Sequence, residues 1–313
     1  MLSRTAADLY WLSRYFERAE NTARMLDVAW NLSLIPFAVN AREEIAAPLV
    51  ISGSGALYEQ CHGEVRIDRV LHFFTLDENN PGSIFHCLRD ARENAHAVRG
   101  KITAEMWESV NSTWLELREI RALGVDGYGA SEFFDWVKNR SHLFRGVAHG
   151  TMRRGDAFEF WRMGVFIERA ENTIRLLAAR AHTFKPSGPA QRADTATLDY
   201  YQWGTLLRSV NAYKAYREIY KSQIDLRRVV ELLTLNPEIP RSVMACVEEI
   251  YEILEGLRPR SRSFEHANDL LTRLQSARID RIYRTGMSRF LEDYRSGLHE
   301  LSLQIQKDFL MIQ

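Results

Sequence analysis

The chain has 313 residues, of which 46% are hydrophobic, and its 41 lysines and arginines balance 41 aspartates and glutamates. Proteins that bind duplex nucleic acid usually carry a basic excess, and a membrane-spanning helix needs about 20 consecutive apolar residues; the chain shows neither feature. Its three cysteines form no Cys-x-x-Cys pair, and its N-terminal segment is too charged for a secretory signal. The composition therefore predicts a globular cytoplasmic protein that binds neither nucleic acid nor membrane.

The first predicted helix covers residues 5–34, where apolar residues recur at alternating steps of three and four. This buried stripe consists of Leu9, Leu12, Phe16, Ala19, Ala23, Leu26 and Trp30. The sequence SGSG at 52–55 predicts a break, and the helical signal around Glu59 is weak. Further helices are predicted at 64–76, 81–99, 102–123, 131–149, 156–184, 197–220, 223–235, 240–256, 263–275 and 279–310, with a linker at 185–194. Strand signals are nearly absent, so the predicted fold class is all-α.

Three of these helices carry start signals. Pro81 and Pro240 are expected to begin helices, because proline at the first helical position loses an amide hydrogen that would have no partner there. Asp156, followed by Glu159, predicts the N-terminal cap of the helix at 156–184, where the helix dipole favours carboxylates.

Two segments of the chain recur in the same order. LYWLSRYFERAENTARML at 9–26 matches FWRMGVFIERAENTIRLL at 160–177, and ERAENT is identical in both. IDRVLHFFTLDENNPGSIFHCL at 67–88 matches LRRVVELLTLNPEIPRSVMACV at 226–247. This order predicts a duplicated helical bundle with halves 1–150 and 151–313, related by an approximate twofold axis within one compact domain. The two ERAENT helices are expected to be adjacent.

A polar strip borders the apolar stripe of each ERAENT helix. The strip consists of Glu17, Arg18, Glu20, Asn21 and Arg24 in the first copy and of Glu168, Arg169, Glu171, Asn172 and Arg175 in the second. Acid-before-base pairs four residues apart support a helix by themselves, which is one reading of the pattern. The identity of six consecutive residues in both copies favours a shared constraint. That constraint is either an interlocked ion-pair network, with Glu17 and Glu168 buried and bonded to arginines, or a ligand or partner site.

Other candidates for chemistry are weaker. Glu59-x-x-His62 and Glu93-x-x-His96 have the spacing of di-iron ligands, but both lie in the first half, and nearby arginines oppose metal binding. We find no nucleophile motif and no phosphate-binding loop, so neither a cofactor nor a metal is expected. Arg92 and Asn94 lie either at a solvated helix end or in a second wall of a groove that contains the polar strip.

Taken together, several motifs resemble those of the Alpha-E family, an all-helical domain named for its helices and its Glu-Arg motif. The resemblance covers essentially the whole chain and rests on WLSRYFERAE, NPGSI, AREN and MWESVN in the first half, and on HGTMRRGD, FIERAENT and PRSV in the second. The resemblance implies that Glu17 and Arg18 form the family's Glu-Arg motif, with Glu168 and Arg169 as their counterparts in the second half.

The resemblance also implies partners. Such proteins are typically encoded beside, or fused to, circularly permuted ATP-grasp proteins that resemble amide-bond ligases, and near transglutaminase-like or peptidase proteins. Two functions are then open: a non-catalytic helical partner or scaffold of the ligase in peptide synthesis or modification, or an enzyme that uses the Glu/Arg strip for acid–base chemistry on a peptide or amide. The first is preferred, because the sequence shows no complete catalytic constellation.

Overall fold

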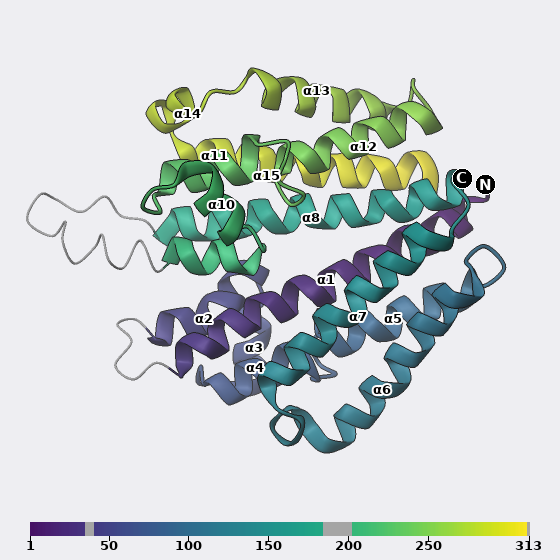
Figure 1. Cartoon of the computed structure of the whole chain (residues 1–313), viewed down its shortest axis with the longest axis vertical. Coiled ribbons are helices and arrows are strands. Elements are labelled where there is room, and N and C mark those ends of the chain that lie inside the picture. The colour runs from purple at the N-terminus through teal and green to yellow at the C-terminus, as the bar shows by residue number, and fades with distance from the viewer. Residues whose placement is uncertain (35–40, 184–201, 312–313) are drawn as a thin grey trace, which may run out of the picture. The chain divides into compact units, whose positions relative to one another are not determined.

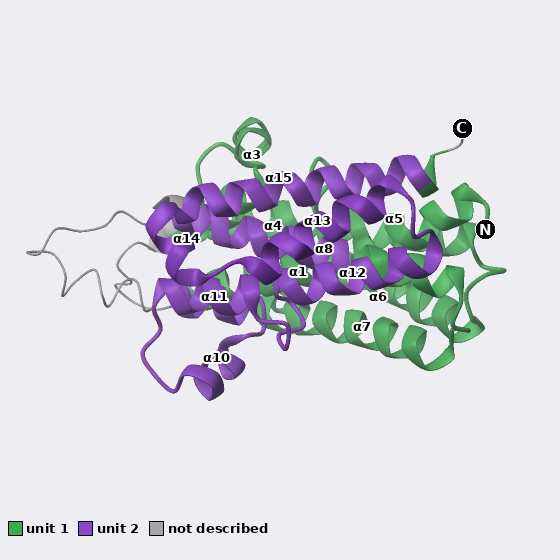
Figure 2. Cartoon of the chain, turned by 90° about the horizontal axis from the view of Figure 1, so that it is seen from above, with its two compact units in different colours: residues 1–165, 309–313 green, residues 166–308 purple. Residues whose placement is uncertain are grey.

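The computed structural model describes residues 1–34, 41–183 and 202–311, so the predicted linker at 185–194 lies outside the described residues. Helices make up the regular structure of these ranges, which contain no strand, and the prediction of an all-α fold is confirmed. The chain forms two compact units, coloured separately in Figure 2: residues 1–165 with 309–313, and residues 166–308. In the chain, the division between these ranges falls inside helix α8 (Asp156–Thr183). The halves 1–150 and 151–313 stay a prediction. The twofold relation of the halves stays a prediction.

Unit 1 is built around α1 (Ser3–Ser33), which packs against α2, α4, α5 and α7 (Figure 1). The surrounding helices are α2 (Ala41–Ser52), α3 (Gly55–His62), α4 (Ile67–Thr75), α5 (Ile84–Ala97), α6 (Ala104–Tyr128), α7 (Ala130–Thr151) and the first part of α8. The predicted stripe of α1 is buried except at Trp30, and the side chains of Tyr10, Ser13 and Glu17 are buried as well. Helix α1 is thus covered on more than one side.

Helices α2 and α3 were not predicted. Helix α2 contains Pro48, a residue that normally argues against a helix interior, and α3 is short. The predicted break at 52–55 does separate them, at Gly53 with a φ of 71°. Helix α3 is held by Tyr58, which is buried and donates a hydrogen bond to the carbonyl oxygen of Glu64 at 3.1 Å. Tertiary contacts therefore outweigh the weak local signal in this segment.

Unit 2 contains the rest of α8, a helical segment at 202–209, and a set of helices in which α12 packs on α13, and α13 on α15. Its other elements are α10 (Tyr213–Tyr220), α11 (Leu226–Leu235), α12 (Val243–Leu257), α13 (Arg262–Ser276), α14 (Ile279–Thr285), α15 (Met287–Ile305) and the start of a π-helical turn, Gln306–Leu310. Two predicted helices are interrupted. The one at 197–220 breaks at Asn211 (φ 56°) and the one at 279–310 breaks at Gly286 (φ 118°), because a left-handed backbone conformation ends a right-handed helix. Residues 197–201 lie outside the described ranges.

The two prolines do not begin helices, contrary to the prediction. Helices α5 and α12 start three residues after Pro81 and Pro240, at Ile84 and Val243. The residue before each start is a serine that acts as N-cap: Ser83 Oγ accepts a hydrogen bond from the amide of His86 at 3.3 Å, and Ser242 Oγ accepts one from Ala245 at 3.0 Å. A capping hydroxyl accepts a hydrogen bond from one of the unpaired amides at the start of a helix, whereas a proline there only removes an amide hydrogen. The serines therefore set the start of both helices. Helix α8 does begin at Asp156.

The matching segments 67–88 and 226–247 share further local structure. Thr75 and Thr234 each donate to a carbonyl oxygen one turn earlier, at 2.7 and 2.6 Å. Asp77 and Asn236 each accept a hydrogen bond from the amide two residues further on, both at 2.8 Å. The two sequence-similar segments therefore fold in the same local way.

Replacement of Ser242 by alanine should destabilise unit 2 by about 1–2 kcal/mol, the upper part of the range for a lost N-cap. Ser242 is fully buried, and besides capping α12 it donates to the carbonyl oxygen of Asn236 at 2.5 Å. The free energy of unfolding in urea measures the loss. Ser276→Ala is the control, because Ser276 is exposed and should change stability by less than about 0.5 kcal/mol. Equal stability of the two variants would contradict the capping role.

Candidate functional site

The first ERAENT segment lies in a seam between α1 and α7. The carboxylates of Glu17 and Glu20 are 1% and 0% exposed, and both accept hydrogen bonds from Nη1 of Arg145 on α7. The distance from Arg145 Nη1 to Glu17 Oε2 is 3.0 Å. One guanidinium therefore compensates two buried carboxylates, and the prediction that Glu17 is buried and bonded to an arginine is confirmed.

The seam continues toward the C-terminus of α1. Arg24 donates from Nε to Glu20 Oε1 at 2.8 Å, and its Nη2 lies 3.2 Å from Nε2 of His142. Lys138 Nζ donates to Asp27 Oδ2 at 2.8 Å. Lys138, His142 and Arg145 are spaced by four and three residues, so they share one face of α7 and meet the charged face of α1 in antiparallel order.

Charges in the seam stabilise one another. Burial lowers the pKa of Lys138, but hydrogen bonds to Asp135 and Asp27 outweigh burial and raise that pKa above its ordinary value. The ammonium is therefore retained at neutral pH, where it holds the end of the seam together. The side chain of His142 is 52% accessible, so the seam is open to solvent at this residue.

Apolar packing surrounds the buried carboxylates. The rings of Phe16 and Phe144 stack with centroids 4.1 Å apart, and Ser141 Oγ donates to the carbonyl oxygen of Phe16 at 3.3 Å. Both contacts join α1 to α7 at Phe16, next to Glu17, whose side chain is almost fully buried. In such a dry environment an ion pair is strong, but the loss of one partner is costly.

The second ERAENT segment is organised differently. Glu168 is also fully buried, and its Oε1 lies 3.7 Å from Nη2 of Arg175, so the corresponding prediction is confirmed. Glu171 and Asn172 are only partly buried, whereas their counterparts Glu20 and Asn21 are buried. Identical residues thus occupy unlike environments in the two units.

The remaining predicted site residues lie around these centres. Asn21 is buried next to Glu20, whereas the guanidinium groups of Arg18 and Arg169 each lie 5.8 Å from the ring of the aromatic residue three positions earlier. Arg92 donates to Asn111 Oδ1 at 3.0 Å and lies 5.8 Å from the Trp107 ring, at the junction of α5 and α6. Asn94 is partly buried on α5. A groove with the polar strip in one wall and Arg92 and Asn94 in the other stays a prediction.

Arg145, His142 and Lys138 were missed by the sequence analysis. Their spacing on one helix was a usable signal, but nothing local indicates that this face meets the Glu/Arg strip. The two candidate metal pairs find other partners: His62 Nε2 lies 2.6 Å from Asp77 Oδ2, and Glu93 accepts from Arg92 at 2.8 Å. Glu59 lies in helix α3, contrary to the doubt about its segment. Among the described residues, no group of three histidine, cysteine or acidic side chains has the geometry of a metal site.

The dipeptide Glu-Arg occurs twice in the sequence, at 17–18 and 168–169, each time on a long helix. The model of the Alpha-E family, described as a predicted alpha-helical domain with a conserved ER motif, matches residues 1–310. The chain belongs to the Alpha-E family. In this member the glutamate of each Glu-Arg dipeptide is the buried residue, while the arginine lies on an aromatic ring.

Curated relatives in this comparison are uncharacterized proteins of Mycobacterium bovis and of two strains of Mycobacterium tuberculosis. Each is 24% identical over 328 residues, which covers 95% of this chain and 35% of the relative. The chain therefore spans about a third of the length of these relatives. No solved structure matches the chain. Within the described residues, no helix combines the length and apolarity needed to cross a bilayer.

Proposed function

We propose that this Alpha-E chain is a non-catalytic helical partner or scaffold of a circularly permuted ATP-grasp amide ligase in a peptide synthesis or modification system. The observation that carries the proposal is the burial of Glu17 and Glu20 under Arg145. An acid–base catalyst must reach the proton that it transfers, and these carboxylates are sealed and already hydrogen-bonded. The Glu/Arg motif then serves to fix α1 against α7, and the surface of the bundle is left for partners.

Family membership and chain length support the proposal further. Membership of the Alpha-E family implies that the gene lies beside, or is fused to, a gene for an ATP-grasp protein, and near genes for transglutaminase-like or peptidase proteins. The curated relatives are almost three times as long as the region they share with this chain, which leaves room for a fused protein of this kind. A helical partner that docks the ligase or presents its peptide substrate accounts for both arrangements.

We also propose that the two halves of the chain arose by duplication and that the protein works in the cytoplasm. The recurring ERAENT segments and the matching caps of α5 and α12 support the duplication. Its three cysteines are all free thiols, as is usual in a reducing compartment. Superposition of the halves in an experimental structure tests the first proposal, and localisation of the tagged protein tests the second.

Purification of the chain together with the ATP-grasp protein encoded nearest to its gene tests the main proposal. The two proteins should elute as one complex, and ATP turnover by the ligase should rise in the presence of the chain. The chain alone should hydrolyse no ATP and contain no stoichiometric transition metal. Bovine serum albumin at the same concentration controls for nonspecific stabilisation of the ligase.

Two results would overturn the proposal. If the proteins elute separately and turnover is unchanged, the chain is not a partner of the ligase. If the chain alone converts a peptide or amide, or contains two iron, manganese or zinc ions that are lost in Glu93→Ala, the enzymatic function takes its place.

A further inference from the structure

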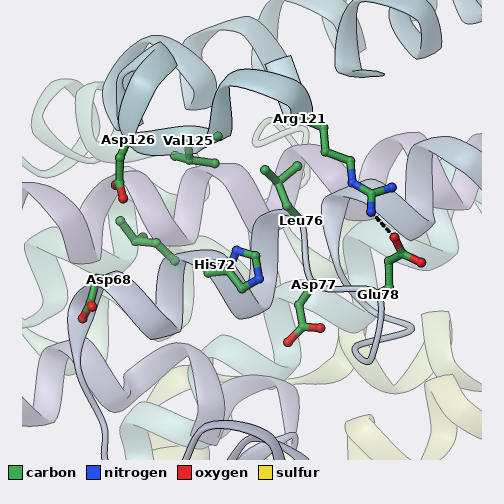
Figure 3. Close-up of a pocket in the computed structure, with 10 residues that line it drawn as sticks. Asp68, His72, Leu76, Asp77, Glu78, Arg121, Val125 and Asp126 are labelled. Atoms are coloured by element: carbon green, nitrogen blue, oxygen red, sulfur yellow. Dashed lines mark hydrogen bonds and ion pairs between the residues drawn. The ribbon is translucent and has the colours of Figure 1, made fainter. Parts of the chain in front are cut away.

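A cavity of about 410 Å³ opens in unit 1 between the end of α4 and the end of α6. Figure 3 shows Val125 and Asp126 across from His72, with the Arg121–Glu78 ion pair at one end. The cavity exists because α6 kinks at Gly124, whose φ of 75° turns the last part of the helix away from its axis. Its volume is within the range of sites that bind small ligands.

The cavity combines an apolar floor with an acidic rim. Leu71, Leu76 and Val125 are buried, whereas Asp68 and Asp126 are exposed at the rim. This arrangement matches a long side chain with an apolar stem and a charged head, because the stem can be buried while the head stays near water.

Acidic side chains are in excess at the cavity: four line it, against Arg121 among the lining residues and Arg66, which pairs with Asp68 at 3.0 Å. Burial raises the pKa of Asp77, but hydrogen bonds from Asn79 and His62 outweigh burial and lower it below its ordinary value. Burial also raises the pKa of Asp68, but hydrogen bonds from Arg66 and from the backbone of Arg69 outweigh burial and lower that pKa below its ordinary value. Both carboxylates are therefore ionised at neutral pH, and the cavity favours a cation.

A second cavity, of about 670 Å³, lies in unit 2 and includes the end of α11, whose sequence matches the end of α4. It is formed by the end of α11 and by the junction of α13 with α14, as the first is formed by the end of α4 and by the end of α6. Residues that match in the repeat line both: His72 and Glu231, Leu76 and Leu235, Asp77 and Asn236, Glu78 and Pro237. Three acidic side chains and one arginine line the second cavity, so the excess of negative charge recurs although the residues differ.

The cavity fits an organic cation better than a metal ion. Arg121 binds Glu78 and His62 binds Asp77, so these carboxylates are oriented by neighbours and do not converge on one point. Among the described residues, no cluster has metal-binding geometry, and an ion would leave the apolar floor without a contact. A lysine or arginine side chain uses both parts of the cavity.

We propose that the cavity between α4 and α6 binds a lysine or arginine side chain of a partner polypeptide, with its stem on Leu71, Leu76 and Val125 and its charged head between Asp68 and Asp126. The cavity of unit 2 is a second site for the same chemistry. This inference does not depend on the identity of the partner, so it can hold even where an ATP-grasp ligase fails to bind.

Titration of the full chain with blocked tripeptides tests the site. The probe is acetyl-Ala-Lys-Ala-amide, and the controls carry norleucine or glutamate in place of lysine. Methyl NMR signals of Leu71, Leu76 and Val125 should shift with the lysine peptide. Its affinity should fall about fivefold in Asp126→Asn, which removes one exposed carboxylate, and at least as much in Asp68→Asn, which also leaves Arg66 without its partner beside the site. Binding should weaken further as salt is added.

Glu119→Gln is the matched control, because Glu119 is an exposed acid on the same helix as Asp126 but does not line the cavity. Its affinity for the lysine peptide should equal that of the wild type. Equal binding of the norleucine peptide would reduce the cavity to an apolar site and overturn the proposal. Preferential binding of the glutamate peptide, or the absence of shifts with any peptide, would overturn it as well.

Discussion

Replacement of Arg145 by methionine should lower the free energy of unfolding by about 3 kcal/mol, the lower end of the range for a broken buried ion pair. Methionine keeps the apolar stem but removes the cation that Glu17 and Glu20 share. The two carboxylates remain in a nearly dry seam, where their mutual repulsion is poorly screened. Arg24 still binds Glu20 at 2.8 Å, which limits the loss. Urea denaturation at neutral pH measures it.

Arg89→Met provides the control for this substitution. Arg89 pairs with Asp90 at 2.8 Å on α5, but 43% of its side chain is accessible, and an exposed pair contributes about 0–1 kcal/mol. The two variants thus remove the same residue type from the same unit and differ in the burial of the partner. A loss below about 1 kcal/mol in Arg145→Met would contradict a stabilising network and would favour a functional role of the Glu/Arg motif.

Replacement of Gly164 by alanine should destabilise the protein by about 2–3 kcal/mol, although alanine normally stabilises a helix interior by about 1 kcal/mol over glycine. Gly164 lies in α8 where this helix passes α1, and an added Cβ would collide with the carbonyl oxygen of Tyr10 and the hydroxyl of Ser13. Because one of these atoms belongs to the backbone, the clash can be relieved only by separating the helices. Thermal or urea unfolding reports the effect.

Gly146→Ala is the matched substitution inside a helix. Nothing lies within 4 Å of a Cβ built at Gly146, which is exposed on α7. This variant should therefore be up to about 1 kcal/mol more stable than the wild type. The prediction is that the two substitutions change the free energy of unfolding in opposite directions. A stabilised Gly164→Ala variant would show that α1 and α8 are not in contact at this point.

Much of the fold follows from local pattern. The steps of three and four in α1 and α8 predicted both helices to within two residues of their bounds, because residues with this spacing lie on one face only if the segment is helical. The helices at 41–62 were not predicted because they are short and one of them contains Pro48, so their sequence shows little helical periodicity. Boundaries at Ser83 and Ser242 were misplaced because a capping serine competes with a nearby proline as a start signal.

The candidate site was predicted in part. In the sequence, Glu17 and Glu168 border an apolar stripe, and from this position their burial beside arginines was predicted. The packing of the helices shows which arginine is used: Arg145, 128 positions after Glu17, supplies the charge in unit 1, while Arg175 lies near Glu168 in unit 2. Helices form from hydrogen bonds between residues four positions apart, so local sequence is enough to predict them. Which helix face meets α1 depends instead on packing between helices that are distant in the sequence. The same holds for Gly164 and for the cavity at Gly124, where a missing side chain has consequences set by neighbours remote in sequence.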